Sequence, residues 1–338
     1  MYRRCLALYS GGLDSIICVR LINDLGIEVV PLYFATPFFG FSALLAPSEF
    51  KQKHSSRFGV MPEIIDYTEN FIKILASPEH GYGKHMNPCI DCKIGMLKMA
   101  GGLMDEYSAS FVITGEVLGQ RPMSQRKDAM NVIERDSGLK GLLVRPLCAR
   151  HMPESIPEKE GIINKEDMLD ITGRGRRKQE AIALSYGVLK ENIPSPAGGC
   201  LLTYAQIADK VRRTLERFSP EIPSGADFAM DVIGRKFILD SDTVMIVPRD
   251  EQENLLAEKL KFPGNVFVKI DNVPGPTGVI RGTVNTVNLE MAASICLRYT
   301  KARGTGGNTA SWGKSPETLK NHISADIIDD GLIEALHS

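Results

Sequence analysis

The chain has 338 residues, and its 40 lysines and arginines nearly balance its 41 aspartates and glutamates, so the formal net charge is −1. Hydrophobic residues make up 43% and charged residues 24%, a composition that excludes a globally disordered chain. No apolar run reaches the roughly 20 residues that span a bilayer, and the N-terminus does not resemble a signal peptide. The length predicts about two domains. The charge balance argues against nucleic acid only if the charges are evenly spread.

In chain order, predicted strands and helices alternate through the first part of the sequence. Strands are expected at residues 4–9, 28–34, 61–67 and 110–114. Helices are expected at residues 16–25, 47–58 and 93–107. This alternation is typical of an α/β fold with a doubly wound parallel sheet.

The pattern changes after residue 147 and again after residue 218. Two short helices at 165–171 and 177–186 precede a charged amphipathic helix at 204–218. The stretch 219–225 holds two prolines and a glycine, which predicts a linker. Beyond it we expect a smaller α+β module, with strands and helices at residues 231–239, 243–247, 250–260, 266–270 and 285–299. The predicted domains are therefore residues 1–218 and 225–338, with the boundary near residue 222.

A glycine loop follows the first predicted strand. Residues 10–15 read Ser-Gly-Gly-Leu-Asp-Ser and lead into a helix. Glycines let the backbone approach an anion, and the helix start offers free N–H groups and a positive dipole end. Ser10 and Ser15 add hydroxyl donors, and Asp14 suits a magnesium ion at bound phosphates. The loop lacks the lysine of a Walker A motif and the Rossmann glycine spacing, and an ordinary strand-to-helix turn remains the alternative.

This loop resembles the SGGxDS signature of the PP-loop ATP pyrophosphatases, which release pyrophosphate and transfer AMP. A second stretch, residues 114–125 after the fourth strand, resembles the TGExLGQxxSQ stretch of the 4-thiouridine synthase family ThiI. The resemblance covers roughly residues 1–215. One departure is Arg126, where the family often has threonine after the SQ pair. The resemblance implies an adenine nucleotide α-hydrolase-like fold and a site for ATP and Mg²⁺. It implies the ATP-binding residues Ser10, Gly11, Gly12, Asp14, Ser15, Thr114, Gly115, Glu116 and Gln120.

The seven cysteines are odd in number and no secretion signal precedes them, which favours a reducing cytoplasm over a disulfide framework. Cys89 and Cys92 form a Cys-x-x-Cys pair at the entry to a helix, where thiol pKa values fall. Cys200 follows two glycines, which let the chain fold around a bulky group. Cys5, Cys18 and Cys296 lie in apolar elements and are interpreted as structural, and Cys148 is undecided.

Three cysteines do not complete an all-cysteine zinc site. Their pattern resembles the iron–sulfur-dependent tRNA thiolases, including archaeal ThiI-like enzymes and the TtuA family. That resemblance implies a 4Fe-4S cluster on Cys89, Cys92 and Cys200, with one iron open for sulfide. Two alternatives remain: a zinc site completed by His80 or His85, and a catalytic persulfide of the MnmA type. Because only Cys296 follows Cys200, sulfide or cluster-bound sulfur is favoured over a persulfide relay.

Two further features point to RNA. Arg174, Arg176, Arg177 and Lys178 place four cations at a helix start, where they oppose the helix dipole. Arginine forks suit the phosphates of tRNA or ATP, although a solvated helix start is the commoner explanation. The region beyond residue 225 resembles the small RNA-binding domain of NFACT-type proteins, through residues 233–237 and 248–254. A loop at residues 303–308 either follows an RNA backbone or is an ordinary surface loop.

Together these features predict a cytoplasmic, ATP-dependent tRNA sulfurtransferase with Asp14, Cys89, Cys92 and Cys200 as catalytic residues. A uridine oxygen would attack the α-phosphate of ATP, and sulfur would then displace AMP, with 4-thiouridine preferred over 2-thiouridine as product. The expected partners are tRNA and either sulfide or a sulfur donor protein, with no membrane and with homodimerisation left open. The rival hypotheses are a zinc-containing, QueC-like nucleobase ligase and an RNA-binding protein with a degenerate PP loop.

Overall fold

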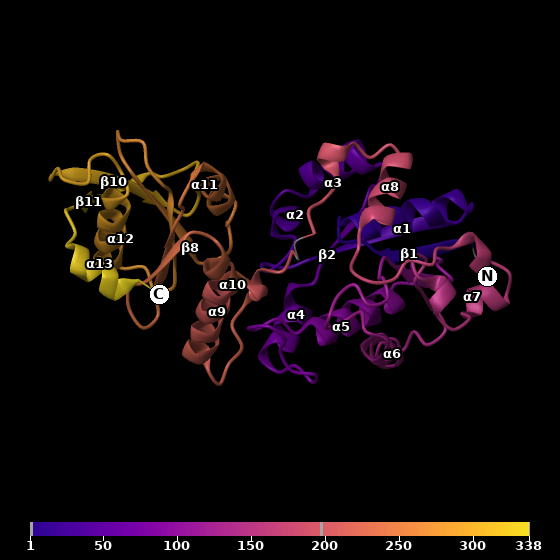
Figure 1. Cartoon of the computed structure of the whole chain (residues 1–338). Helices are drawn as coiled ribbons and strands as arrows, with labels where there is room; N and C mark the ends of the chain where they lie inside the picture. Colours follow the sequence, from indigo (N-terminus) through magenta and orange to yellow (C-terminus); the bar gives the residue numbers. More distant parts are fainter. Residues whose placement is uncertain (1–2, 197–198, 338) are drawn as a thin grey trace. The chain divides into compact units, whose positions relative to one another are not determined.

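The computed structural model describes residues 3–196 and 199–337, and the chain divides into two compact units, Met1–Tyr204 and Ala205–Ser338. Figure 1 shows both units, coloured from the N-terminus to the C-terminus. Each unit has its own sheet. Within the described ranges, every helix is too short or too polar to cross a membrane.

The first unit is built on a five-stranded parallel sheet with the order β3-β2-β1-β4-β5. Its strands are β1 (Arg4–Leu8), β2 (Glu28–Ala35), β3 (Glu63–Asp66), β4 (Phe111–Thr114) and β5 (Leu143–Val144). The predicted α/β class with a parallel sheet is confirmed. The strand order reverses direction between β1 and β4, and in such sheets the loops leaving those two strands flank a ligand crevice. The 10–15 loop and the 114–125 stretch leave these two strands.

Helices cover both faces of this sheet (Figure 1). On one face α1 (Leu13–Asp24) packs against α8 (Arg177–Ser185), and on the other α5 (Cys89–Gly102) packs against α4 (Thr68–Ala76) and α6 (Lys127–Asp136). The remaining helices and 3-10 turns of this unit are α2 (Phe41–Leu45), α3 (Pro47–Phe58), α7 (Ile156–Lys159), η1 (Ala149–His151), η2 (Lys165–Asp167), η3 (Lys190–Asn192) and η4 (Leu201–Thr203). The helix expected at 165–171 is thus a single 3-10 turn.

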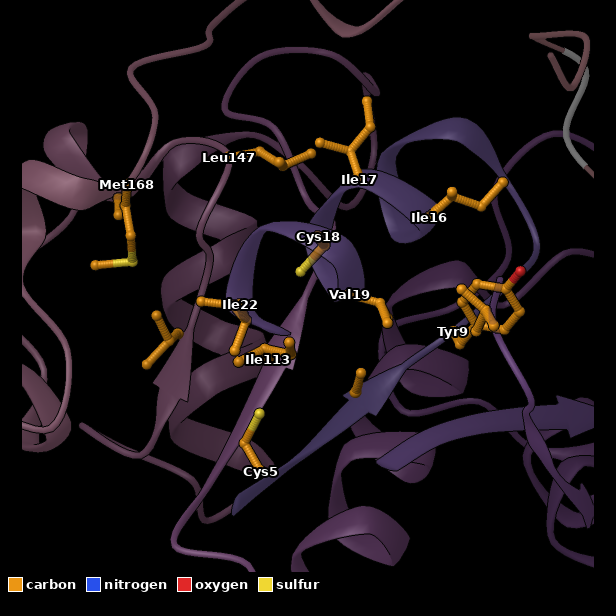
Figure 2. Close-up of a cluster of buried hydrophobic side chains, with 14 of the residues drawn as sticks. Cys5, Tyr9, Ile16, Ile17, Cys18, Val19, Ile22, Ile113, Leu147 and Met168 are labelled. Carbon is orange, nitrogen blue, oxygen red and sulfur yellow. The ribbon is translucent and has the colours of Figure 1, made fainter. Parts of the chain in front are cut away.

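An apolar core fixes the position of β1 against α1. Alternate residues of the β1 segment, Cys5, Ala7 and Tyr9, are buried on the face that α1 covers. Figure 2 shows Ile16, Ile17, Val19 and Ile22 of α1 gathered above this strand. Because each large buried aliphatic side chain contributes about 1.5–3 kcal/mol, this core holds the start of α1, and with it the glycine loop, in a defined place.

The second unit is a six-stranded antiparallel sheet with the order β11-β10-β8-β9-β7-β6. Its strands are β6 (Arg235–Ile238), β7 (Val244–Val247), β8 (Asn265–Ile270), β9 (Gly278–Arg281), β10 (Asn308–Gly313) and β11 (Asn321–Ala325). Its helices are α9 (Ala205–Phe218), α10 (Gly225–Val232), α11 (Glu251–Glu258), α12 (Thr286–Arg298) and α13 (Asp330–Leu336). The sheet packs against α12, which agrees with the expected α+β class.

The division between the units differs from the predicted boundary near residue 222. Helix α9 packs against α10 and so belongs to the second unit, and residues 219–225 join these two helices. The start of the predicted strand 231–239 is instead the end of α10, which Ser224 and Asp227 cap reciprocally. The capping pair Ser-x-x-Asp begins at Ser224, inside the stretch interpreted as a linker, and ends just beyond it at Asp227.

Candidate functional site

The glycine loop after β1 is shaped to receive an anion. Gly11 has φ +70°, a left-handed conformation that favours glycine. Ser15 Oγ donates to the Gly12 carbonyl at 2.8 Å, and the Gly12 N–H reaches Ser10 Oγ at 3.3 Å. Helix α1 begins at Leu13, and its N-cap, Gly12, has no side chain with which to cap it. The first-turn N–H groups are therefore available to a bound phosphate.

The loop after β4 lies directly against this glycine loop. A Cβ atom built on Gly115 would lie 2.6 Å from the Asp14 carbonyl carbon and oxygen and 2.8 Å from the Ser15 nitrogen. Gln120 Nε2 donates to Asp14 Oδ2 at 3.0 Å. The two motifs singled out in the sequence thus form one site, and Asp14 is the residue at which they meet.

Several buried polar atoms around Asp14 have no partner within the described residues. They are Asp14 Oδ1, Gln120 Oε1 and, apart from a contact with the Asp14 carboxyl itself, the side-chain polar atoms of Gln179. Gln179 is fully buried on α8, on the side facing Asp14. An unpartnered buried polar atom costs about 1–3 kcal/mol, so a cluster of them is the mark of a site that a ligand completes. Sequence reasoning missed Gln179, because a glutamine in a helical pattern looks like any exposed polar residue.

Opposing effects act on the Asp14 carboxyl. Burial raises its pKa, and the Gln120 amide and the nearby cations Arg176 and Arg121 lower it, with a net rise. A divalent cation beside the carboxyl would add the missing positive charge and favour the ionised form. The donor set around Asp14, made of carboxylate and amide oxygens, is the hard oxygen set that Mg²⁺ takes.

Glu116 and Thr114 stabilise the loop after β4, called the second loop below, through buried hydrogen bonds. Glu116 Oε2 accepts from Thr114 Oγ1 at 2.9 Å and from Arg145 Nε at 3.2 Å. Arg145 also donates to Glu134 Oε2 at 2.7 Å. Burial alone would raise the pKa of Glu116, but Lys93 and Arg145 outweigh it, so that the pKa is lowered. The carboxylate predicted to line the nucleotide pocket therefore has protein partners in this structure.

The basic stretch lies beside the second loop. Thr172 forms a parallel bridge with Leu118, and the Gly173 N–H donates to the Leu118 carbonyl at 2.8 Å. Arg176 Nη2 donates to the Pro194 carbonyl at 2.8 Å and is close enough to Asp14 to lower its pKa. The other three predicted RNA contacts, Arg174, Arg177 and Lys178, are exposed. The basic stretch thus combines one arginine near Asp14 with three cations that face solvent.

Cys89, Cys92 and Cys200 come together although the last is far away in sequence. Cys89 and Cys92 occupy the first turn of α5. Burial raises the pKa of Cys92, and the neighbouring Cys200 and Cys89 raise it further. Burial and Cys89 raise the pKa of Cys200 to about 12, a backbone N–H opposing them. Asn87 Nδ2 donates to Cys89 Sγ at 3.0 Å. Three close thiols that repel one another as thiolates need a soft cation to ionise together.

Of the two histidines proposed as zinc ligands, His80 has other partners and His85 is exposed. His80 Nδ1 lies 2.7 Å from Asp91 Oδ1, and Nε2 lies 3.7 Å from Asp136 Oδ2. His85 is exposed and has φ +60°. Among the residues that the structure describes, the only three acidic, histidine or cysteine side chains with ligand atoms all within 4.8 Å are Glu79, His80 and Asp91. At least one pair of the three thiols therefore lies farther apart than 4.8 Å, beyond the roughly 4 Å between thiolates on one tetrahedral zinc ion.

The other four cysteines are buried. Cys5 and Cys18 lie among the aliphatic side chains of Figure 2, and burial raises their pKa values. Cys148, undecided from sequence, donates from Sγ to the Glu116 carbonyl at 3.3 Å and so supports the second loop. Cys296 packs in the core of the second unit.

Comparison with known proteins divides the chain in a similar way. Residues 2–166 match the family model of the thiamine biosynthesis protein (ThiI), and residues 234–334 match that of the NFACT protein RNA binding domain. A protein of Thermococcus kodakarensis described as a probable tRNA sulfurtransferase is 26% identical over 169 residues. The match covers 50% of this chain and 39% of the relative, so the chain spans about two fifths of that protein's length.

Solved structures give weaker likenesses. A 4-thiouridine synthetase in complex with RNA and ATP is 17% identical, with a TM-score of 0.34 over 56% of this chain and 53% of that one. The U34-tRNA thiolase NcsA from Methanococcus maripaludis, with its [4Fe-4S] cluster, is 16% identical, with a TM-score of 0.31 over 68% and 70%. Likeness at these TM-scores carries no argument about fold or function. The two family matches confirm the resemblances noted in the sequence: residues 2–166 are similar to the ThiI family, and residues 234–334 are similar to the NFACT RNA-binding domain.

Proposed function

We propose that this protein is an ATP-dependent tRNA sulfurtransferase that adenylates a tRNA uridine and replaces a uracil oxygen with sulfur. The observation that carries the proposal is the contact of the two motif loops at Asp14. Buried polar atoms there lack a hydrogen-bond partner within the described residues. The ThiI match, the name of the Thermococcus relative and the RNA-binding family match support the substrate class.

The residues of the glycine loop would bind the phosphates of ATP. The N–H groups at the start of α1 would donate to the charge that develops when the uracil oxygen attacks the α-phosphate. The hydroxyls of Ser10 and Ser15 hydrogen-bond within the loop and so hold its shape. Arg176 would stabilise the same charge from the other side. Asp14 would hold Mg²⁺, which neutralises phosphate charge when bound. Pyrophosphate leaves, and a sulfide equivalent then displaces AMP from the adenylated base, preferably at the 4-position, as in the ThiI family.

Cys89, Cys92 and Cys200 would hold a 4Fe-4S cluster rather than zinc. Their grouping and their wide spacing suit a polynuclear cluster better than a single ion. When bound, such a cluster with three protein ligands supplies one iron that is open to sulfide. The chain's own contribution is to hold and orient the sulfur atoms: the Asn87 amide donates to Cys89 Sγ at 3.0 Å.

The RNA would be held by charge and by the second unit. Arg174, Arg177 and Lys178 are exposed cations suited to backbone phosphates. The segment 234–334 supplies the family match to an RNA-binding domain.

The test follows pyrophosphate and modified nucleosides together. Protein purified anaerobically should contain iron, absorb broadly in the visible and release pyrophosphate from ATP when tRNA is present. Mass spectrometry of the digested tRNA should then detect thiouridine. ATP binding without tRNA-dependent pyrophosphate release would point to a non-catalytic RNA-binding protein, and zinc with activity on a free nucleobase would point to a QueC-like ligase.

Single cysteine variants locate the sulfur chemistry. Cys89→Ala, Cys92→Ala and Cys200→Ala should each lose iron and thiouridine formation, while Cys296→Ala, far from this site in sequence and buried in the core of the second unit, should keep both. Full iron content and activity in Cys200→Ala would overturn the three-cysteine cluster. Activity without iron, inhibited by thiol alkylation, would instead support a persulfide mechanism.

A further inference from the structure

A histidine outside both sequence motifs lies against the glycine loop. His54, on α3, accepts or donates a hydrogen bond at Nδ1 with the hydroxyl of Tyr9, 2.9 Å away. Tyr9 is buried and directly precedes Ser10. Burial raises the pKa of Tyr9, so its hydroxyl stays protonated and is the donor. Nδ1 is then the acceptor, which places the imidazole proton on Nε2.

The surroundings keep this imidazole neutral and fix its plane. Burial and the nearby charges of Lys53 and Arg57 lower the pKa of His54 to about 4. The ring stacks on Phe50, with centroids 4.2 Å apart and planes at 28°, and meets the ring of Tyr9 edge-on at 82°. The Nε2–H bond therefore has one direction rather than several.

The ring edge that carries Nε2 lies beside the glycine loop. A Cβ atom built on Gly11 would lie 2.7 Å from His54 Cε1 and 3.6 Å from Nε2, so this edge of the ring lies on the loop backbone. Gly11 is thus required twice, for its positive φ and for the ring that its missing side chain admits. No partner for Nε2 is found within residues 3–196 and 199–337.

We propose that His54 Nε2–H donates a hydrogen bond to the pyrophosphate portion of ATP, and that Tyr9 is the positioning residue that sets the tautomer. The inference rests on the proposed function, because it takes ATP as the ligand of the glycine loop. The loop offers anion-binding N–H groups, and the neutral donor of His54 beside this loop adds a directed contact to the same anion.

Binding measurements on the full chain separate the ligand's parts. Affinities for Mg-ATP, Mg-pyrophosphate and AMP are measured by calorimetry for the wild type and for His54→Asn, His54→Gln and Tyr9→Phe. His54→Asn removes the Nε2 donor and should weaken ATP and pyrophosphate binding about tenfold, the size of a hydrogen bond to a charged acceptor, with AMP unchanged. His54→Gln extends an amide donor toward the Nε2 position and should recover much of the affinity. Tyr9→Phe should weaken the binding of ATP and pyrophosphate less than His54→Asn does. The imidazole ring stays in place and loses only the hydrogen bond that fixes its tautomer.

The outcomes distinguish this inference from the proposed function. Equal weakening of AMP and ATP would place the ring at the adenosine and overturn the proposal, as would unchanged binding in folded His54→Asn and His54→Gln protein. Thermal unfolding of each variant checks that the fold survives. If the wild type binds neither ATP nor pyrophosphate, the proposed function fails too; if the wild type binds both and the His54 variants match it, only the role of His54 fails.

Discussion

At the residue scale, the proposed nucleotide site depends most on Gly115, a residue without a side chain. Gly115 faces the backbone of Asp14 and Ser15 so closely that a methyl group would lie 2.6–2.8 Å from backbone atoms. Backbone on both sides cannot swing away as a flexible side chain would. The glycine of the second motif is therefore needed for the contact between the two loops, independently of any ligand.

Replacing this glycine should break the site. Gly115→Ala should displace the second loop from the first and weaken ATP binding by more than tenfold, with a decrease of roughly 1–3 kcal/mol in stability from overpacking. Gly102→Ala is the matched control, because a Cβ there meets nothing within 4 Å and alanine is the better helix former. ATP titration and thermal unfolding of both variants test this. Equal ATP affinity in Gly115→Ala and the wild type would contradict the close approach.

The buried pair Glu116–Arg145 makes the stability of the fold depend on pH in the acid range. The pKa of Glu116 is lowered in the folded protein, so its contribution to stability is present above the ordinary value near 4.5 and is lost as the pH falls through the lowered pKa. The stability of the wild type should therefore decline below about pH 4.5, and Glu116→Gln should flatten this decline. Urea unfolding between pH 3 and 7, with exposed Glu106→Gln as control, measures it. An unchanged slope in Glu116→Gln would rule out this linkage.

At the scale of elements, α9 belongs with the elements that follow it. Lys236 Nζ donates to Thr214 Oγ1 of α9 at 2.8 Å and to Asp231 Oδ1 at 2.5 Å, all three residues being buried. Lys210, also on α9, donates to the Gly234 carbonyl at 3.3 Å. Without α9, the buried Asp231–Lys236 pair loses its cover and its third member.

Truncation tests this assignment. A fragment of residues 205–338 should unfold cooperatively, while residues 219–338, which lack α9, should be destabilised by several kcal/mol or fail to fold. Circular dichroism during thermal and urea unfolding provides the measurement. If the two fragments are equally stable, α9 is not part of the second unit, and the predicted boundary near residue 222 is the better one.

Sequence reasoning was most accurate where the signal was local. The β1–loop–α1 segment and the loop after β4 were predictable because strand alternation and glycine motifs can be recognised within a window of about ten residues. Gln179 and His54 were not, because their roles depend on α8 and α3 packing beside a loop far away in sequence. The buried face of α9 was visible as an amphipathic pattern, but the pattern does not say which neighbour covers it.

At the scale of the whole molecule, a net charge near zero hides local asymmetry. Arg174, Arg177 and Lys178 project into solvent from one turn, whereas Arg176 is held at the nucleotide site. Only the exposed cations can neutralise phosphates of an RNA backbone and so release the counterions of the RNA.

The salt dependence of RNA binding should report this asymmetry. Arg174→Ala combined with Arg177→Ala should weaken tRNA binding and reduce the slope of log K against log salt by about 0.7–0.9 for each phosphate that the variant no longer neutralises. Fluorescence anisotropy across a salt series measures the slope, with exposed Lys140→Ala as control. If the slope stays at the wild-type value, this stretch does not bind phosphates.

The anchoring of the segment that carries Cys200 has a kinetic consequence. Arg176 holds the Pro194 carbonyl, and the Leu201 N–H donates to the Phe38 carbonyl at 2.8 Å, so Cys200 lies between two fixed points a few residues apart. A metal centre first captured by Cys89 and Cys92 would meet this third thiol as an intramolecular ligand, at an effective concentration in the millimolar range. If the proposed cluster forms, chelation of this kind would make recapture by the three thiols faster than escape of the centre.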